Sequence, residues 1–204
     1  METSRTGLLV VMSGPSGVGK GTLIDELITR NSNVKLSISA TTRSPRPGEV
    51  DGVDYYFVDR AKFEDMIEDG EFIEYTQFFN AHYYGTPKTM VEEELASGND
   101  IILEIDVKGA MRIKETYPDA VLIFIVPPSR SELKTRLIKR GTEDIATIER
   151  RFTGASQEFP YMEKYDYIVV NEVIDMALRR IEAIVTAEKC KAFRCKTVID
   201  SFKE

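Results

Sequence analysis

The sequence predicts an α/β fold: helices cover both faces of a parallel sheet, and a small strand-rich insertion is added to this three-layer core. Short apolar runs alternate with segments of helical spacing over most of the 204 residues. The runs at 101–103 and 120–126 are continuously apolar, which is typical of parallel strands buried on both faces. Between 36 and 88, short strands and turns replace the single helix of a simple crossover.

Several of the expected elements end at residues that disfavour their continuation. Gly70 follows a helical segment, Pro127 and Pro128 close the most apolar strand, and the prolines and glycine of 41–49 make that segment irregular. We expect strands at 7–12, 35–39, 55–58, 71–78, 100–106, 120–126 and 166–170. We expect helices that begin near 23, cover 61–69, 90–95, 110–116, 129–139 and 145–159, and run on from 173.

Composition and charge narrow the class of protein. The formal net charge is −7 and the pI is about 5.0, so bulk charge does not favour binding to a nucleic-acid backbone. The single His82 cannot form a histidine metal site, and Cys190 and Cys195 lack the paired spacing of zinc ligands, so reduced thiols are expected. No segment has the features of a signal peptide or a membrane span, which predicts a cytoplasmic protein that does not bind a membrane. The acidic net charge predicts that it does not bind nucleic acid.

A glycine-rich segment joins the first apolar run to the first helical segment, and in this context such a segment predicts phosphate binding. Its glycines let successive backbone N–H groups point into one concavity, and the following helix adds its own unsatisfied N–H groups. A lysine supplies a mobile positive charge. The alternative is a glycine-rich turn with an incidental lysine. The segment consists of Gly14, Pro15, Ser16, Gly17, Val18, Gly19, Lys20, Gly21 and Thr22.

Acidic residues at the end of the strand at 100–106 are candidates for a magnesium site beside a nucleotide phosphate. Asp106 is the better candidate ligand, directly or through water, and Glu104 precedes it by two residues. Gly21 stands where a phosphate loop usually has the Ser or Thr that contacts magnesium, so the hydroxyl of Thr22 is a weaker candidate. The alternative makes Glu104 and Asp106 ordinary helix-capping or salt-bridge acids.

A second phosphate site is predicted in the proline-rich loop. Arg43 and Arg46 lie three residues apart there, and two guanidinium groups can converge on one phosphate. Tyr55 and Tyr84 are candidate hydroxyl donors to the same phosphate. The alternatives are solvated loop arginines and tyrosines that pack in the core.

A third group of arginines flanks the break at 141–142 between two predicted helices. Arg136, Arg140 and Arg151, with Arg150 beside the last, could swing over a bound nucleotide and neutralise charge during phosphoryl transfer. The alternative is an ordinary solvated surface on a charged helix pair.

Ordered blocks along the chain resemble guanylate kinase, most closely the bacterial type. The phosphate loop is one block, and Tyr83-Tyr84-Gly85-Thr86 and Val169-Val170-Asn171 are two others. The resemblance covers nearly all of 5–190. The remaining blocks lie at 39–46, 48–55, 72–75, 102–106 and 140–143.

The resemblance implies a magnesium-dependent enzyme that transfers the γ-phosphate of ATP to GMP, and to dGMP, giving ADP and GDP for guanine nucleotide synthesis and recycling. Glu74, with Ser39 and Thr86, would read the guanine, because one carboxylate accepts both N1–H and the N2 amino group, a donor pair that adenine lacks. Glu104 would also contact GMP, although many relatives have aspartate there, and Asn171 would lie near the adenine of ATP. The residues that would bind the GMP phosphate are Arg43, Arg46, Tyr55 and Tyr84, and those that would act in catalysis are Lys20, Arg43, Arg136, Arg140 and Arg151.

The resemblance also implies a division of one domain at 5–187 into a core, a GMP-binding lobe and a lid, followed by a tail. It says nothing of the oligomeric state. The core would comprise 5–35, 89–128 and 165–187, the lobe 36–88, the lid 129–164 and the tail 188–204.

Three other classes of protein share parts of this pattern. A guanylate-kinase-like interaction module usually lacks the phosphate loop that this chain retains. A kinase for another small phosphate ester would have the loop, but not Glu74 together with Ser39 and Thr86. A regulatory GTPase would need switch segments and guanine-reading motifs that are not found in the sequence.

Overall fold

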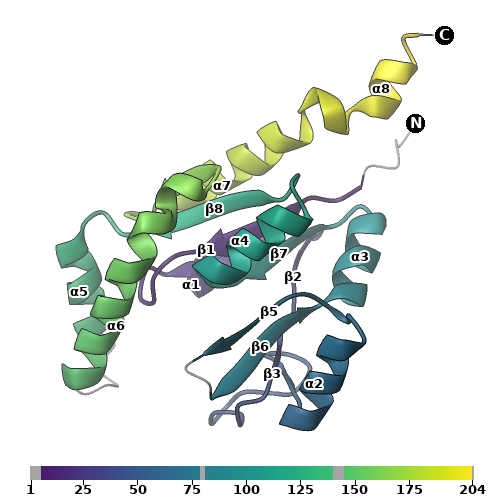
Figure 1. The fold of residues 1–204 in the computed structure, drawn as a ribbon. Coiled ribbons are helices and arrows are strands. Elements are labelled where there is room, and N and C mark those ends of the chain that lie inside the picture. Colours follow the sequence, from purple (N-terminus) through teal and green to yellow (C-terminus); the bar gives the residue numbers. More distant parts are fainter. Residues whose placement is uncertain (1–5, 79–80, 140–144, 204) are drawn as a thin grey trace.

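The computed structural model describes residues 6–78, 81–139 and 145–203, which form two sheets and the helices around them (Figure 1). The larger sheet has the strand order β2-β7-β1-β8-β9, and all its pairings are parallel. Its strands are β1 (Leu9–Ser13), β2 (Val34–Leu36), β7 (Asp100–Glu104), β8 (Val121–Val126) and β9 (Tyr167–Val170). The smaller sheet has the order β4-β3-β6-β5, with β3 (Ala40–Thr41), β4 (Tyr56–Phe57), β5 (Phe72–Phe78) and β6 (His82–Pro87). These sheets confirm the predicted α/β class and the strand-rich insertion.

Helices lie on both faces of the parallel sheet, because its crossovers run in opposite directions from the centre. The connection from β1 through α1 (Lys20–Arg30) leads to one edge, and the connection from β7 through α4 (Val107–Thr116) leads to the other side of β1. Right-handed crossovers of opposite direction place their helices on opposite faces. The other helices are α2 (Arg60–Glu68), α3 (Lys88–Ala96), α5 (Arg130–Lys139), α6 (Ile145–Glu158), α7 (Ile174–Lys189) and α8 (Lys196–Asp200), with 3-10 turns at Phe159–Lys164 and Ala192–Arg194.

The hydrophobic core lies between the parallel sheet and these helices. Every residue of β1 is buried, and five of the six residues of β8 are buried as well. Leu23, Ile24 and Leu27 of α1 pack under one face, at the helical spacing that the sequence shows. A rigid central strand therefore supports the glycine-rich segment that follows it.

The predicted strand at 35–39 is wrong as a single element. The chain leaves the parallel sheet after Leu36, where the backbone N–H of Ser37 still donates to Ile102 O, and enters the smaller sheet at Ala40. The alternation of side chains continues across this point, so the sequence pattern does not reveal the change of sheet. After this switch the chain forms the smaller sheet and α2, which lie apart from the parallel sheet as a smaller lobe (Figure 1), and α3 then leads to β7.

The smaller lobe has its own aromatic core. Phe63 of α2 is fully buried, and its ring stacks on Phe72 and Tyr83 at centroid distances of 4.5 Å and 5.1 Å. The side chain of Asp59 accepts a hydrogen bond from the Lys62 backbone and caps α2. Residues 55–58 form a shorter strand than expected, Tyr56–Phe57, because Asp51 and Asp54 accept backbone N–H groups in a turn.

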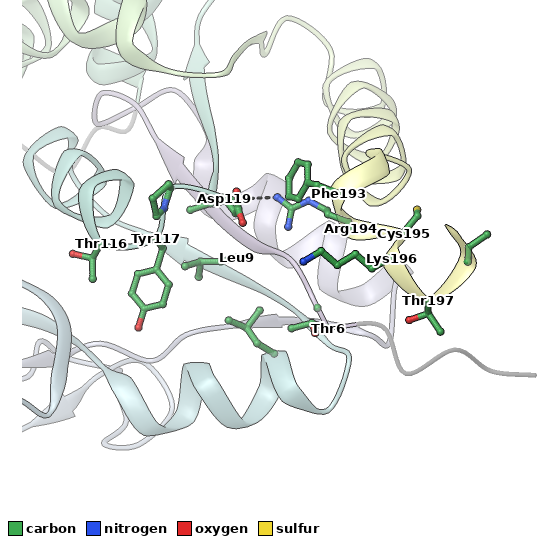
Figure 2. A pocket seen from close by; sticks show the side chains of 15 residues that line it. Thr6, Leu9, Thr116, Tyr117, Asp119, Phe193, Arg194, Cys195, Lys196 and Thr197 are labelled. Carbon is green, nitrogen blue, oxygen red and sulfur yellow. Dashed lines mark hydrogen bonds between the residues drawn. The ribbon is translucent and has the colours of Figure 1, made fainter. Parts of the chain in front are cut away.

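The C-terminal part of the chain packs against the amino-terminal ends of the strands of the parallel sheet. The buried carboxylate of Asp100 accepts from the Leu8 backbone at 3.0 Å and pairs with Lys189 at 2.6 Å. A cavity of about 540 Å³ lies at this edge, between the start of β1, the turn at 116–120 and residues 193–198 (Figure 2). The glycine-rich segment follows the carboxyl end of β1, so this cavity and the glycine-rich segment lie at opposite ends of the strands. No helix in the described ranges is long and apolar enough to cross a membrane.

Candidate active site

The glycine-rich segment forms a tight loop between β1 and α1, and its backbone requires glycine. Gly14, Gly17 and Gly19 have φ angles of 143°, 92° and 90°, a region that other residues rarely adopt. A Cβ at Gly14 would lie 2.3 Å from the carbonyl oxygen of Ile125 on the neighbouring strand. In contrast, a Cβ at Gly21 would meet nothing within 4 Å, so no steric reason excludes a hydroxyl residue there. Pro15 and Val18 are buried in this loop, whereas the exposed Thr22 lies in the first turn of α1.

Lys20 points back over the loop rather than away from it. Its Nζ donates to the backbone carbonyl of Gly14 and lies 3.9 Å from Oε1 of Glu104 at the end of β7. Its side chain is 14% exposed. This places the ammonium group at the concave side of the loop, beside the acidic end of the neighbouring strand.

Two contacts from distant parts of the chain support the loop. The side-chain amide of Asn171, after β9, donates to Val18 O at 2.8 Å, and a Cβ at Gly19 would lie 2.7 Å from the same nitrogen. Asn171 is 4% exposed, so it lies beneath the loop. From α6, Arg151 NH1 donates to the hydroxyl of Ser16 at 3.0 Å. The expected contact of Asn171 with adenine stays a prediction.

The smaller lobe holds Arg43 in a buried, fully oriented position. NH1 and NH2 of Arg43 donate to the two carboxylate oxygens of Glu49, each at 2.6 Å, and the guanidinium lies 4.8 Å from the ring centroid of Tyr55. Hydrogen bonding to Glu49, opposed by burial, raises the pKa of Arg43, and the hydroxyl of Tyr84 also interacts with it. Hydrogen bonds from Arg43 and from the Arg46 backbone lower the pKa of Glu49 to about 2. The structure therefore brings Arg43, Tyr55 and Tyr84 together.

Arg46 does not join this cluster through its side chain. Its backbone N–H donates to Glu49 at 2.7 Å, while the residue is exposed. Sequence reasoning missed Glu49 as a site residue, although it lies within one of the blocks that resemble guanylate kinase. Its contact is made by a folded loop, so no periodic signal in the sequence marks it.

Glu74 and Thr86 face each other on β5 and β6 and form the second polar pair of the lobe. The Thr86 hydroxyl donates to Glu74 Oε1 at 2.7 Å, and the two residues are 0% and 6% exposed, respectively. Burial raises the pKa of Glu74 to about 7, the hydrogen bond from Thr86 opposes this rise, and the charge of Asp106 reinforces it. Ser39 precedes β3 and is half-buried, and its carbonyl accepts from Tyr56.

Asp106 caps α4. A helix cap was the alternative to a magnesium ligand that the sequence left open for this residue. Its Oδ1 accepts a hydrogen bond from the Gly109 backbone at 2.7 Å. The same carboxylate raises the pKa of Glu74, so Asp106 faces the smaller lobe as well as its own helix. No group of three His, Cys, Asp or Glu residues suited to a metal ion occurs among the residues that the structure describes.

Glu104 acts on both halves of the site. Besides its contact with Lys20, its charge adds to the burial that raises the pKa of Tyr55, while Arg43 opposes that rise. The phosphate loop and the Arg43 cluster therefore lie within electrostatic range of one shared carboxylate. A contact between Glu104 and GMP stays a prediction.

Helices α5 and α6 carry predicted arginines of the third group. Arg136 Nε donates to Glu132 at 2.9 Å within α5, and Arg150 NH2 donates to Thr147. Arg140 lies outside the described residues. Sequence reasoning also missed Glu158, at the end of α6. Burial raises the pKa of Glu158, and the charge of Lys20 opposes this rise. Glu158 and Arg151 lie seven residues apart on α6, so one face of this helix is directed at the phosphate loop.

Comparison with known proteins places this geometry in one family. A sequence model of the family described as guanylate kinase matches residues 6–188. The chain belongs to the guanylate kinase family. It is 51% identical over 201 residues to guanylate kinase from Clostridioides difficile, with 98% of each chain covered, and 48% identical over 204 residues to that from Caldanaerobacter subterraneus subsp. tengcongensis, with 100% and 98% covered.

A crystal structure of guanylate kinase from Anaplasma phagocytophilum has the same fold. Its TM-score is 0.77 at 37% identity, over 94% of this chain and 90% of that one. The family resemblance predicted from the ordered blocks is thereby confirmed. The glycine-rich loop also distinguishes this chain from the interaction modules considered above, which usually lack it, because its positive-φ glycines and Lys20 are present.

Proposed function

We propose that this guanylate kinase family member transfers the γ-phosphate of ATP to GMP through the residues described above, giving ADP and GDP. The observation that carries the residue assignment is the pair of cationic sites, Lys20 and Arg43, whose surroundings share the carboxylate of Glu104. Membership of the family supports the reaction itself. A donor phosphate on the glycine loop and an acceptor phosphate beside Arg43 would face each other across the site.

ATP would bind to the glycine loop. The N–H groups of the loop and of the first turn of α1 are donors for its phosphates, and Lys20 follows the γ-phosphate as charge develops on it. An oxygen of the GMP phosphate attacks the γ-phosphorus in line, the new P–O bond forms as the bond to the ADP oxygen breaks, and ADP leaves. The acceptor is already an anionic nucleophile, so the chain needs to supply position and positive charge rather than a strong base.

GMP would bind in the smaller lobe. Arg43, held by Glu49, presents its remaining donors with the hydroxyls of Tyr55 and Tyr84, and Arg46 adds a second cation as the lobe closes. The Glu74 carboxylate would accept N1–H and the N2 amino group of guanine. Adenine offers no such pair, so it would leave a buried carboxylate unsatisfied, and discrimination of several kcal/mol, on the order of 10³-fold or more, follows.

Magnesium fits the oxygen donors present, although few of them come from the protein. Kinases commonly hold Mg²⁺ through substrate phosphates, waters and one or two carboxylates. Asp106 would contribute through water, since Oδ1 already caps α4, and the exposed hydroxyl of Thr22 is a second donor. When bound, the ion neutralises charge on the β- and γ-phosphates.

The proposed division of labour follows the domain boundaries expected from the sequence. The core 5–35, 89–128 and 165–187 would hold ATP, the lobe 36–88 would hold GMP, and the lid 129–164 would close over both. Arg151 and Arg136 would then neutralise the transferring phosphate, and closure would exclude water and limit hydrolysis. We also propose a cytoplasmic location and no role in nucleic-acid binding, in keeping with the net charge of −7.

An ADP-release assay with ATP, Mg²⁺ and a panel of GMP, dGMP, AMP, UMP and CMP tests the proposal. We expect turnover with GMP and dGMP and a loss of about 10³-fold or more in kcat/KM for AMP. Comparable rates with AMP or a pyrimidine nucleotide would contradict the proposed role of Glu74. Phosphate release without any acceptor, at the same rate, would contradict phosphotransfer.

A further inference from the structure

Gly109 is a buried glycine in the first turn of α4, where its backbone conformation does not require glycine. It does not belong to the glycines with positive φ, and its N–H donates to Asp106 as any residue at this position could. Glycine in a helix is less favourable than alanine by about 1 kcal/mol. The reason for a glycine here must therefore lie in the space around it.

That space is occupied by the carboxylate of Glu74. A Cβ at Gly109 would lie 2.8 Å from Glu74 Oε2, closer than a carbon and a carboxylate oxygen can approach without displacement, and 3.3 Å from Asp106 Oδ1. The other oxygen of Glu74, Oε1, is held at 2.7 Å by the Thr86 hydroxyl. The carboxylate thus lies between a threonine on β6 and the amino end of α4, and a Cβ at Gly109 would force Oε2 to shift from this position.

We propose that Gly109 is a positioning residue for guanine recognition: its missing side chain lets the Glu74 carboxylate lie against the first turn of α4. This rests on the proposed function, in which Glu74 reads the base. Both donors of guanine require the carboxylate to stand in one orientation, so a displacement of less than 1 Å would misalign at least one of the two hydrogen bonds. A helix from the core thereby sets the orientation of a specificity residue that belongs to the lobe.

The proposal separates Gly109 from a glycine that serves only packing. We would compare Gly109→Ala with Lys108→Ala, a change at the exposed neighbouring residue of α4. Gly109→Ala should raise the KM for GMP by about 10- to 100-fold, the effect of losing a hydrogen bond to a charged group, while the KM for ATP stays within about twofold. Lys108→Ala should leave both KM values unchanged. Equal shifts of the two KM values in Gly109→Ala, or no shift at all, would overturn the proposal.

A double-mutant cycle with Glu74→Ala decides whether Gly109 acts through Glu74. In the Glu74→Ala background, adding Gly109→Ala should cause no further loss in kcat/KM for GMP, because the displaced group is gone. If Gly109→Ala alone does not fold, the double variant should fold again, as judged by its thermal midpoint. A full additional loss, or a double variant that stays unfolded, would overturn the proposal. If Glu74→Ala alone uses GMP normally, the base-reading role of Glu74 in the proposed function fails instead.

Discussion

Arg43 and Glu49 form a two-point ion pair in the smaller lobe, with NH1–Oε2 and NH2–Oε1 distances of 2.6 Å each. The guanidinium is thereby oriented before any phosphate arrives, and the Ser44 carbonyl accepts from it as well. Pre-orientation lowers the entropy that a cation loses when it binds an anion. The pair explains how a residue that is only 9% exposed can keep its charge and still present donors to a ligand.

Removing this partner should weaken GMP binding. Glu49→Gln leaves Arg43 without its orienting carboxylate, so we expect the KM for GMP to rise by about tenfold while the KM for ATP is unchanged. The exposed Glu71→Gln in the same lobe is the matched control. Steady-state kinetics with each substrate varied in turn provide the measurement. A lower KM for GMP would mean that Glu49 competes with the phosphate rather than supporting the site.

The pH dependence of GMP use should report Glu74. Its pKa of about 7 lies above the ordinary value of about 4.3, and only the carboxylate accepts both guanine donors. The KM for GMP should therefore rise as the pH falls below about 7. The GMP phosphate titrates in a similar range, so Glu74→Gln is the control. Its KM for GMP should be high at every pH and should lack the part of the pH dependence that is due to Glu74. Identical profiles for the two proteins would contradict the assignment.

The same group should affect the stability of the substrate-free protein. Because the folded state raises the pKa of Glu74, its contribution to stability is fully present below about pH 4 and is lost as the pH rises through about 7. Replacing it with the neutral Glu74→Gln should therefore raise the thermal midpoint more at pH 8 than at pH 4. Thermal unfolding at both pH values measures this difference, and a pH-independent difference would argue against a buried, ionising carboxyl.

Parts of the site that are contiguous in the chain could be predicted from the sequence, whereas parts made by folding could not. The glycine loop depends on neighbours in sequence, and Gly14, Gly17 and Gly19 have the positive φ angles that a tight turn of this kind requires. Glu49 bonds to Arg43, and Glu158 interacts electrostatically with Lys20, only because the folded loop and α6 bring these residues together. Their residue types and spacings carry no pattern that distinguishes them from solvated acids.

The strand error has a similar physical origin. Alternation at 35–39 indicates extended backbone, and it is silent on which sheet each residue joins. For Asp106, the sequence left a metal ligand and a helix cap as alternatives, and the structure shows the cap. Both roles fall on the Asp106 carboxylate, because Asp106 lies between the end of β7 and the start of α4.

Lys20 should be essential for turnover and unimportant for folding. Lys20→Ala removes the positive charge beside the γ-phosphate, so we expect kcat to fall by about 10³-fold or more, comparable to the loss of a preorganised electrostatic contact. Its circular dichroism and thermal midpoint should stay close to those of the unmodified protein. Lys35→Ala, an exposed lysine on β2, is the control. Turnover within tenfold of normal would contradict the proposed role.

Asn171 should support the ATP side of the site. Asn171→Ala leaves Val18 O without its buried donor, which should cost about 1–3 kcal/mol of stability and loosen the glycine loop. We expect the KM for ATP to rise several-fold and the KM for GMP to change little. The neighbouring exposed residue, varied as Glu172→Ala, is the control. Denaturant unfolding and initial-rate kinetics provide the two measurements, and an unchanged stability would show that the bond is dispensable.

The central claim is that a donor phosphate on the glycine loop and an acceptor phosphate beside Arg43 occupy one site, close enough for direct transfer. Inhibition by a compound that joins adenosine and guanosine 5′-to-5′ through five phosphates tests this claim most directly, because only facing sites can hold both ends. The account predicts one molecule bound per chain, competitive inhibition against both ATP and GMP, and weaker binding in both Lys20→Ala and Glu74→Ala. Competition with one substrate alone, or binding that only one of the two variants weakens, would contradict it.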